Sequence, residues 1–125
     1  AVRVSGGAGL IPPLALVADE LKRRNRDGWT ACLFAPASAR PALMALFALD
    51  AELAQLVATT TEPLLGEIRL AWWRDRLGEL DAGRAPAQPL LQALLAHAVP
   101  AGISGAALAG LEDRWLPVIA ADGQP

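Results

Sequence analysis

Apolar residues recur three and four positions apart along almost the whole chain, and no segment alternates apolar and polar residues as a half-buried strand does. Such spacing places apolar side chains on one face of an α-helix, and proline and glycine stand between the periodic segments. The sequence therefore predicts an all-α protein, a bundle of about five helices. Its 125 residues, 54% of them hydrophobic, suffice for one domain with a buried core.

Start and stop signals divide the chain into the predicted helices. These span residues 13–24, a short turn at 29–34, and then 38–59, 61–80, 90–98 and 105–119. Ser38, Thr61 and Ser104 stand where a helix needs an N-terminal cap, and Gly83 stands where the 61–80 helix should end. Nearly every position of 38–59 is apolar, so we expect this helix to lie centrally, buried on most sides.

Charge and hydropathy exclude several kinds of partner. A formal net charge of -2 gives no basic surface, so nucleic acid is not an expected partner. The longest apolar run, 41–49, is far shorter than the ~20 residues of a membrane span, so we expect no transmembrane segment and a cytoplasmic protein. The single cysteine, Cys32, excludes an internal disulfide and is interpreted as a small buried side chain.

The two ends of the chain carry no targeting pattern. Residues 1–11 have neither the apolar segment of a signal peptide nor an arginine-rich transit pattern, and we interpret them as a flexible lead-in to a domain at 12–125. The chain lacks an initiating methionine and stops abruptly at Gly123-Gln124-Pro125. We therefore expect it to be part of a longer protein.

Two segments resemble the squalene/phytoene synthase family, the head-to-head branch of the trans-isoprenyl diphosphate synthases. They are residues 47–58, FALDAELAQLVA, and residues 62–75, EPLLGEIRLAWWRD. Matching scaffold residues lie at 34–36, at Arg40 and at 88–89, so the resemblance covers about residues 29–98. It implies an isoprenoid-synthase-like helical bundle, the terpenoid synthase fold, of which this chain would be the incomplete N-terminal part.

The chain differs from this family where the family binds metal. Those enzymes hold Mg²⁺ with two aspartates four residues apart on the central helix, and the matching positions here are Ala54 and Ala58. Phe47 and Ala51 stand in place of a tyrosine and an arginine that contact diphosphate. Mg²⁺ requires oxygen ligands, which methyl groups do not offer. The resemblance therefore implies no catalytic residue, no metal site and no cofactor; Mg²⁺ would enter only if the protein were an active enzyme.

In the family, one side of the central helix faces the substrate cavity. About 100° of rotation per residue places Glu52, Gln55 and Thr59 on this side and Arg40 at its edge. The resemblance adds Phe47, and these five are the candidate cavity-lining residues: Arg40, Phe47, Glu52, Gln55 and Thr59. Three of them, Arg40, Glu52 and Gln55, are polar groups on a mostly apolar helix, where an unpaired charge is costly to bury. Either they satisfy the end of a neighbouring helix or they bind a ligand, and both interpretations stay open.

These features predict a non-catalytic pseudoenzyme that binds a protein partner, or an apolar lipid or isoprenoid, in the remaining cavity. The segment 50–55, DAELAQ, resembles a degenerate branch of the family that includes a mitochondrial assembly factor for respiratory complex I. That branch implies a partner in respiratory-complex assembly and a place at the periphery of the inner membrane. Five helices would leave an open apolar groove, which favours a homodimer.

The alternative is a working transferase. It would be a prenyltransferase of isoprenoid biosynthesis that condenses prenyl diphosphates to squalene or phytoene, with its Mg²⁺ ligands supplied from elsewhere in the protein.

Overall fold

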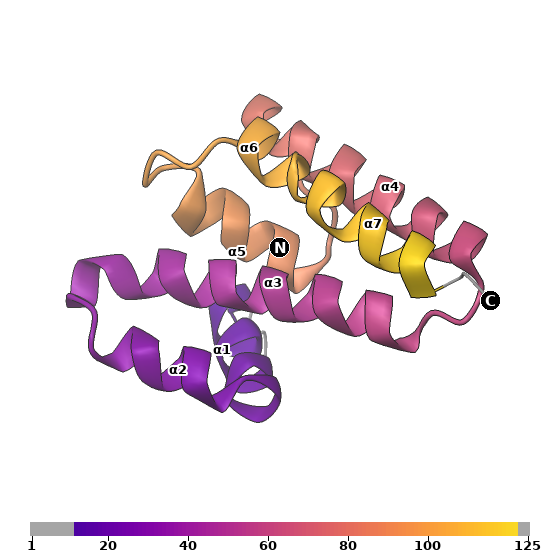
Figure 1. The fold of residues 1–125 in the computed structure, drawn as a ribbon. Coiled ribbons are helices and arrows are strands. Elements are labelled where there is room, and N and C mark those ends of the chain that lie inside the picture. Colours follow the sequence, from indigo (N-terminus) through magenta and orange to yellow (C-terminus); the bar gives the residue numbers. More distant parts are fainter. Residues whose placement is uncertain (1–11, 123–125) are drawn as a thin grey trace.

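The computed structural model describes residues 12–122. Within this range the chain forms seven α-helices and no strand, which confirms the all-α prediction (Figure 1). The helices are α1 (Pro13–Arg24), α2 (Arg26–Leu33), α3 (Arg40–Thr59), α4 (Pro63–Glu79), α5 (Pro89–Ala93), α6 (Gly105–Ala109) and α7 (Leu111–Asp122). The predicted lead-in, residues 1–11, lies outside the described residues.

Helix α3 runs through the middle of the molecule. In the view of Figure 1, α1 and α2 lie on one side of it and α4, α6 and α7 on the other, while α5 packs against both α1 and α3. The helix turns a stripe of buried side chains toward both groups: Ala45, Leu49, Leu53, Leu56 and Val57. Its central position is as predicted, but burial on most sides is not found. Only five of its twenty residues are buried, because no described helix covers the flank that carries Gln55 and Ala58.

One finding differs from the expectation about membranes. The helical segment Ala37–Thr59 is long and apolar enough to cross a membrane, by length and composition alone. A third of its most apolar stretch, 33%, is buried inside the protein, and the core helix of a soluble bundle has the same profile. The segment therefore does not establish a membrane span.

The start of α2 corrects the sequence prediction. A short turn was expected at 29–34, but the helix begins at Arg26, because the Asn25 side chain accepts a hydrogen bond from the Gly28 backbone N–H at 2.9 Å. Ser38, in contrast, caps nothing: it lies in a 3₁₀ turn, Ala37–Ala39, that leads into α3. Thr61 does not cap α4 either, since Glu62 occupies the cap position and makes no side-chain bond there.

For the C-terminal part, the predicted helix start is confirmed, but the prediction of one continuous helix is wrong. Ser104 caps α6 as predicted, accepting a hydrogen bond from the Ala107 backbone N–H at 3.0 Å. The predicted single helix at 105–119 is interrupted at Gly110, where α6 ends and α7 begins one residue later. The segment predicted at 90–98 is helical throughout, but its second half, Leu94–Ala98, is a π turn.

Helices α4, α6 and α7 form a closely packed layer, the α4–α6–α7 layer. The Asp81 carboxylate, just after α4, accepts hydrogen bonds from the backbone N–H groups of Gly105 at 2.6 Å and Ala106 at 3.0 Å. Between α4 and α7, the Arg74 guanidinium donates to both carboxylate oxygens of Glu112 at 3.1 Å. Hydrogen bonds to Asp75 and then to Glu112 raise the pKa of Arg74, so its guanidinium stays charged at any ordinary pH.

Candidate functional site

Three adjoining hollows follow the open flank of α3, and we name them by their walls. The apolar hollow, of about 290 Å³, lies between α1, α3 and α5. The alanine hollow, of about 320 Å³, lies over α3 beside the end of α1. The tryptophan hollow, of about 280 Å³, lies between α3 and α4. Neighbouring hollows share lining residues, among them Ala51, Glu52 and Gln55, so they lie side by side along α3.

The alanine hollow contains the positions at which the sequence resemblance expects the metal ligands. Ala54 and Ala58 line it together with Ala51, and each of these three positions contributes only a methyl group. The polar side chains around these alanines are Arg24, Asn25, Asp50 and Gln55. A single carboxylate therefore lines this hollow, and a guanidinium shares it.

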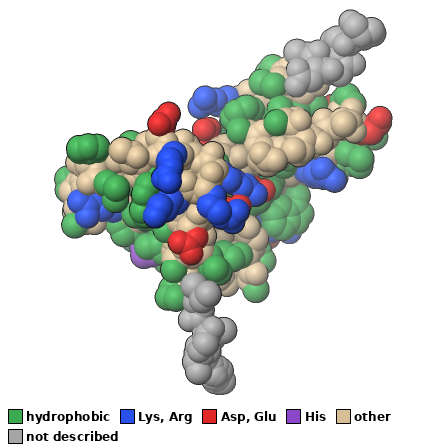
Figure 2. Space-filling model, turned by 90° about the horizontal axis from the view of Figure 1, so that it is seen from below, with side chains coloured by type: hydrophobic (Ala, Val, Ile, Leu, Met, Phe, Trp, Pro, Cys, Tyr) green, Lys and Arg blue, Asp and Glu red, His purple; other side chains and the backbone are tan. Residues whose placement is uncertain are grey.

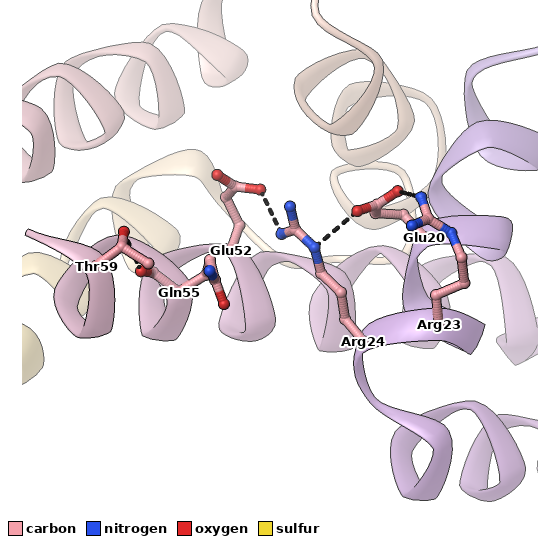
Figure 3. A network of polar contacts seen from close by, with 6 residues as sticks. All are labelled: Glu20, Arg23, Arg24, Glu52, Gln55 and Thr59. Carbon is pink, nitrogen blue, oxygen red and sulfur yellow. Dashed lines mark hydrogen bonds and ion pairs between the residues drawn. The ribbon is translucent and has the colours of Figure 1, made fainter.

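An ion-pair clasp joins α1 to α3 beside the hollows (Figure 3). The Arg24 guanidinium lies between two carboxylates, 2.7 Å from Glu20 on its own helix and 3.0 Å from Glu52 on α3. Arg23 pairs with the other oxygen of Glu20. Seen from the side of α1 and α2, basic and acidic groups gather near the middle of the face among apolar and small side chains (Figure 2). Two arginines and two glutamates make this clasp neutral.

The tryptophan hollow brings together three residues that the sequence singled out. Glu52, Gln55 and Thr59 line its α3 wall, one turn apart, and the Thr59 hydroxyl donates to the Gln55 backbone carbonyl at 2.8 Å (Figure 3). Arg69 and the two tryptophans of α4 form the opposite wall. The two indole rings meet edge to face, with ring centroids 5.3 Å apart, and the hollow thus combines aromatic walls with polar groups at its mouth.

The other two candidate residues lie elsewhere. Arg40 donates from Nε to the Ala35 carbonyl at 3.0 Å and from Nη2 to the Leu33 carbonyl at 3.1 Å, so its guanidinium satisfies the end of α2. This is the first of the two interpretations that the sequence left open for Arg40. Phe47 lies against α2, where its ring would be 3.1 Å from a Cβ atom at Gly28. Neither residue lines the three hollows.

Comparison with known proteins gives the chain its family. The model of the squalene/phytoene synthase family matches residues 21–111, which is more than half of the chain. The chain belongs to the squalene/phytoene synthase family. The bovine (Bos taurus) and human (Homo sapiens) proteins named NADH dehydrogenase (ubiquinone) complex I, assembly factor 6, are each 30% identical to it over 70 residues.

The match covers 56% of this chain and 21% of each relative, so the chain spans about a fifth of the length of these curated relatives. No solved structure was found to match it.

The residues of this squalene/phytoene synthase-like chain do not fit a magnesium ion. Among the described residues, no three His, Cys, Asp or Glu side chains gather as a metal site would require. In the alanine hollow, Asp50 is the one carboxylate, and Arg24 would repel a cation. Cys32 offers no alternative chemistry, since it is fully buried, as the sequence interpretation held, and burial raises the pKa of its thiol.

Sequence reasoning missed the residues that complete the site. Arg24 and Glu20 were not among the predicted candidates, yet Arg24 pairs with Glu20 and also reaches Glu52, 28 residues further along the chain. Arg69 joins Gln55 and Thr59 across the tryptophan hollow. The signal in the sequence was the charge of Glu52 on a mostly apolar helix. Such a charge requires a partner, but the sequence does not indicate which residue supplies it.

Proposed function

We propose that this squalene/phytoene synthase-like chain is a non-catalytic binding or assembly protein. One observation carries the proposal: Ala54 and Ala58, where the sequence resemblance expects the family's first aspartate pair, line the open flank of α3. Ionisation of a prenyl diphosphate requires Mg²⁺ held by carboxylates. Methyl groups at both positions, with a guanidinium nearby, favour loss of the reaction and retention of the scaffold.

The names of the relatives support a protein partner in respiratory complex I assembly. Both relatives are called assembly factors of this complex, and the matched segment covers more than half of the chain. We place this protein in the same process, in the cytoplasm or at the periphery of the inner membrane. The hollows lie side by side on α3 and offer a partner polar groups, aromatic walls and apolar walls.

The assembly role is tested by deleting the gene in its own host. We expect less assembled complex I on native gels and lower NADH:ubiquinone oxidoreductase activity, both restored by the wild-type gene. The variant Ala54→Asp/Ala58→Asp serves as a probe of the flank, since added charge there should impair a protein contact. Normal amounts of complex I in the deletion strain would contradict the assembly role.

The alternative, a prenyltransferase of isoprenoid biosynthesis, is favoured by family membership itself. It is tested with the full-length protein, Mg²⁺ and radiolabelled farnesyl or geranylgeranyl diphosphate. We expect neither squalene nor phytoene above the background of a heat-inactivated sample. Magnesium-dependent formation of either product would replace the non-catalytic proposal by the enzymatic one.

A gain-of-binding experiment tests the geometry of the alanine hollow. Ala54→Asp/Ala58→Asp should restore Mg²⁺ binding in the presence of inorganic pyrophosphate, measured by calorimetry, because two carboxylates would then face the hollow one helical turn apart. The control is Ala15→Asp, which makes a carboxylate pair of the same spacing with the exposed Asp19 on α1. This pair lies away from the three hollows. Equal heats for both variants would mean that the hollow lacks the family's geometry.

A lipid or isoprenoid is a second candidate ligand, and the apolar hollow favours it. Its walls include Leu16, Val17 and Leu90, but at about 290 Å³ it lies at the lower end of the range for small-molecule sites. Mass spectrometry of organic extracts should detect a lipid in the wild-type protein and less of it in Ala48→Leu, which fills the hollow. Extracts without lipid would leave protein binding as the function.

A further inference from the structure

The outer face of α4 carries the largest concentration of exposed apolar side chains in the described residues. Leu64 is 66% exposed, Leu65 48%, Ile68 56% and Trp72 41%, which makes four of the eight large apolar side chains that are exposed there. We call these four residues the α4 stripe. Leu64, Ile68 and Trp72 follow one another every four residues, so the stripe runs about 12 Å along one helix face. Apolar surface gathered in this way marks an interaction site.

Opposite charges lie on the two edges of the α4 stripe. Arg69 is on the edge toward α3, since it lines the tryptophan hollow with Gln55 and Thr59. Glu67 is on the edge toward α7. It precedes Arg74 by two helical turns and therefore lies on the same helix face, and Arg74 contacts Glu112 of α7. Neither Arg69 nor Glu67 forms an ion pair with another described residue; the polar contact of Arg69 is a 3.5 Å hydrogen bond to the Thr60 hydroxyl.

The order of these charges distinguishes between the ways in which two stripes can meet. If two copies pair with their α4 helices antiparallel, a two-fold axis brings like edges together, so arginine faces arginine and glutamate faces glutamate. If the helices run parallel, each edge meets the opposite edge of the other copy. Charges beside an apolar seam select partner and orientation in this way in coiled coils.

We infer that a second copy of this chain pairs through the α4 stripe, with the two α4 helices parallel. Each Arg69 then lies beside Glu67 of the partner subunit, and each Ile68 meets Ile68 of the partner subunit at the centre of the seam. The inference rests on this surface, which shares Trp72 with the tryptophan hollow, and it does not depend on the proposed function. Four partly exposed side chains contribute less than the roughly 800 Å² that a standard interface takes from each partner, so the dimer is weak and concentration-dependent.

Sedimentation over a concentration series tests whether the stripe pairs two copies. The wild-type chain should pass from monomer to dimer, and Ile68→Glu should raise the dissociation constant at least tenfold. Leu33→Glu is the matched control, because Leu33 is 47% exposed on α2, on the opposite side of α3, and should leave the dimer unchanged. Circular dichroism confirms that each variant is folded. A wild-type chain that stays monomeric at every concentration would overturn the inference.

Charge exchange tests the orientation. Arg69→Glu and Glu67→Arg should each weaken the dimer, because each places like charges across the seam, and the double variant should restore it. In an antiparallel pair, like charges face each other in the wild type and in every variant. Equal dissociation constants for the wild type, the two single variants and the double variant would therefore contradict the parallel arrangement.

A disulfide test gives a second measure of orientation. Leu64→Cys should oxidise to a covalent dimer, since equivalent residues face each other only in the parallel pair, while the native Cys32 is fully buried and does not interfere. Cross-linking of Leu64→Cys to Trp72→Cys in a mixture, but not of Leu64→Cys to itself, would indicate antiparallel helices and overturn the inference. A second result would also overturn the inference: a protein that never dimerises but binds phosphatidylcholine vesicles, with the binding abolished by Ile68→Glu. The stripe would then be a lipid-binding face.

Discussion

The two sides of α3 are held by different kinds of contact. In the α4–α6–α7 layer, backbone lies directly against backbone, and Asp81 holds the first N–H groups of α6. On the α1 side, the contact includes the long side chains of Arg24, Glu20 and Glu52, each about one-third exposed, beside a strip of alanines. A side fixed by backbone contacts serves as scaffold, whereas a side closed by flexible charged groups over small residues can change shape around a ligand or partner.

The largest effect is expected at Gly105, where the layer is tightest. A Cβ atom there would lie 2.2 Å from the Leu77 carbonyl oxygen, a backbone atom that cannot rotate away, so Gly105→Ala must push α6 off α4. We expect a loss of about 3 kcal/mol in the free energy of unfolding, measured with urea. Gly78→Ala is the control, because no atom lies within 4 Å of its added methyl group. It should stabilise α4 by roughly 0.5–1 kcal/mol.

An intermediate effect is expected at Asp81, the cap that reaches α6 from the end of α4. Asp81→Ala leaves two backbone N–H groups at the start of α6 without their acceptors and should cost about 1–2 kcal/mol of unfolding free energy. Asp81→Asn keeps one acceptor and should lie between this variant and the wild type. The exposed Asp19, replaced by alanine, should change stability by less than about 0.5 kcal/mol. A result at Asp81 no larger than at Asp19 would show that the layer is held by apolar packing alone.

The elements of the fold could be predicted where a local signal decides them. Apolar periodicity predicted the extent of α1, α3 and α4. Ser104 caps α6 from the residue directly before it, and Gly83 ends the helical segment after α4 with a left-handed φ of 77°. Errors occurred where several residues compete for one role. Asn25 rather than a later residue starts the helix at 26, and Ser38 caps nothing. Such choices depend on which side chain reaches a free N–H group in space.

The candidate site could be predicted along one helix but not across helices. Rotation of 100° per residue places Glu52, Gln55 and Thr59 on one side of α3, since this depends on helical geometry alone, and in the structure all three line the tryptophan hollow. Arg24 and Arg69 come from other helices, and their positions depend on packing angles that no single helix encodes. Arg40 could have served a ligand or a helix end, and only the position of the α2 terminus decided between them. Whether the hollows bind a ligand stays a prediction.

The smallest effect is expected at the clasp, and it gives the sharpest test of the contrast between the two sides. Exposed ion pairs contribute about 0–1 kcal/mol, because water and salt screen the charges and two long side chains lose freedom. Glu52→Gln should therefore cost about 0.5 kcal/mol or less, and a double-mutant cycle with Arg24→Gln should give a coupling energy that falls as NaCl is added. Asp19→Asn, at an exposed carboxylate without an ion pair to another described residue, provides the baseline. A coupling energy above about 2 kcal/mol that persists in high salt would mean that the clasp is buried by a further part of the protein, and the α1 side would then be scaffold as well.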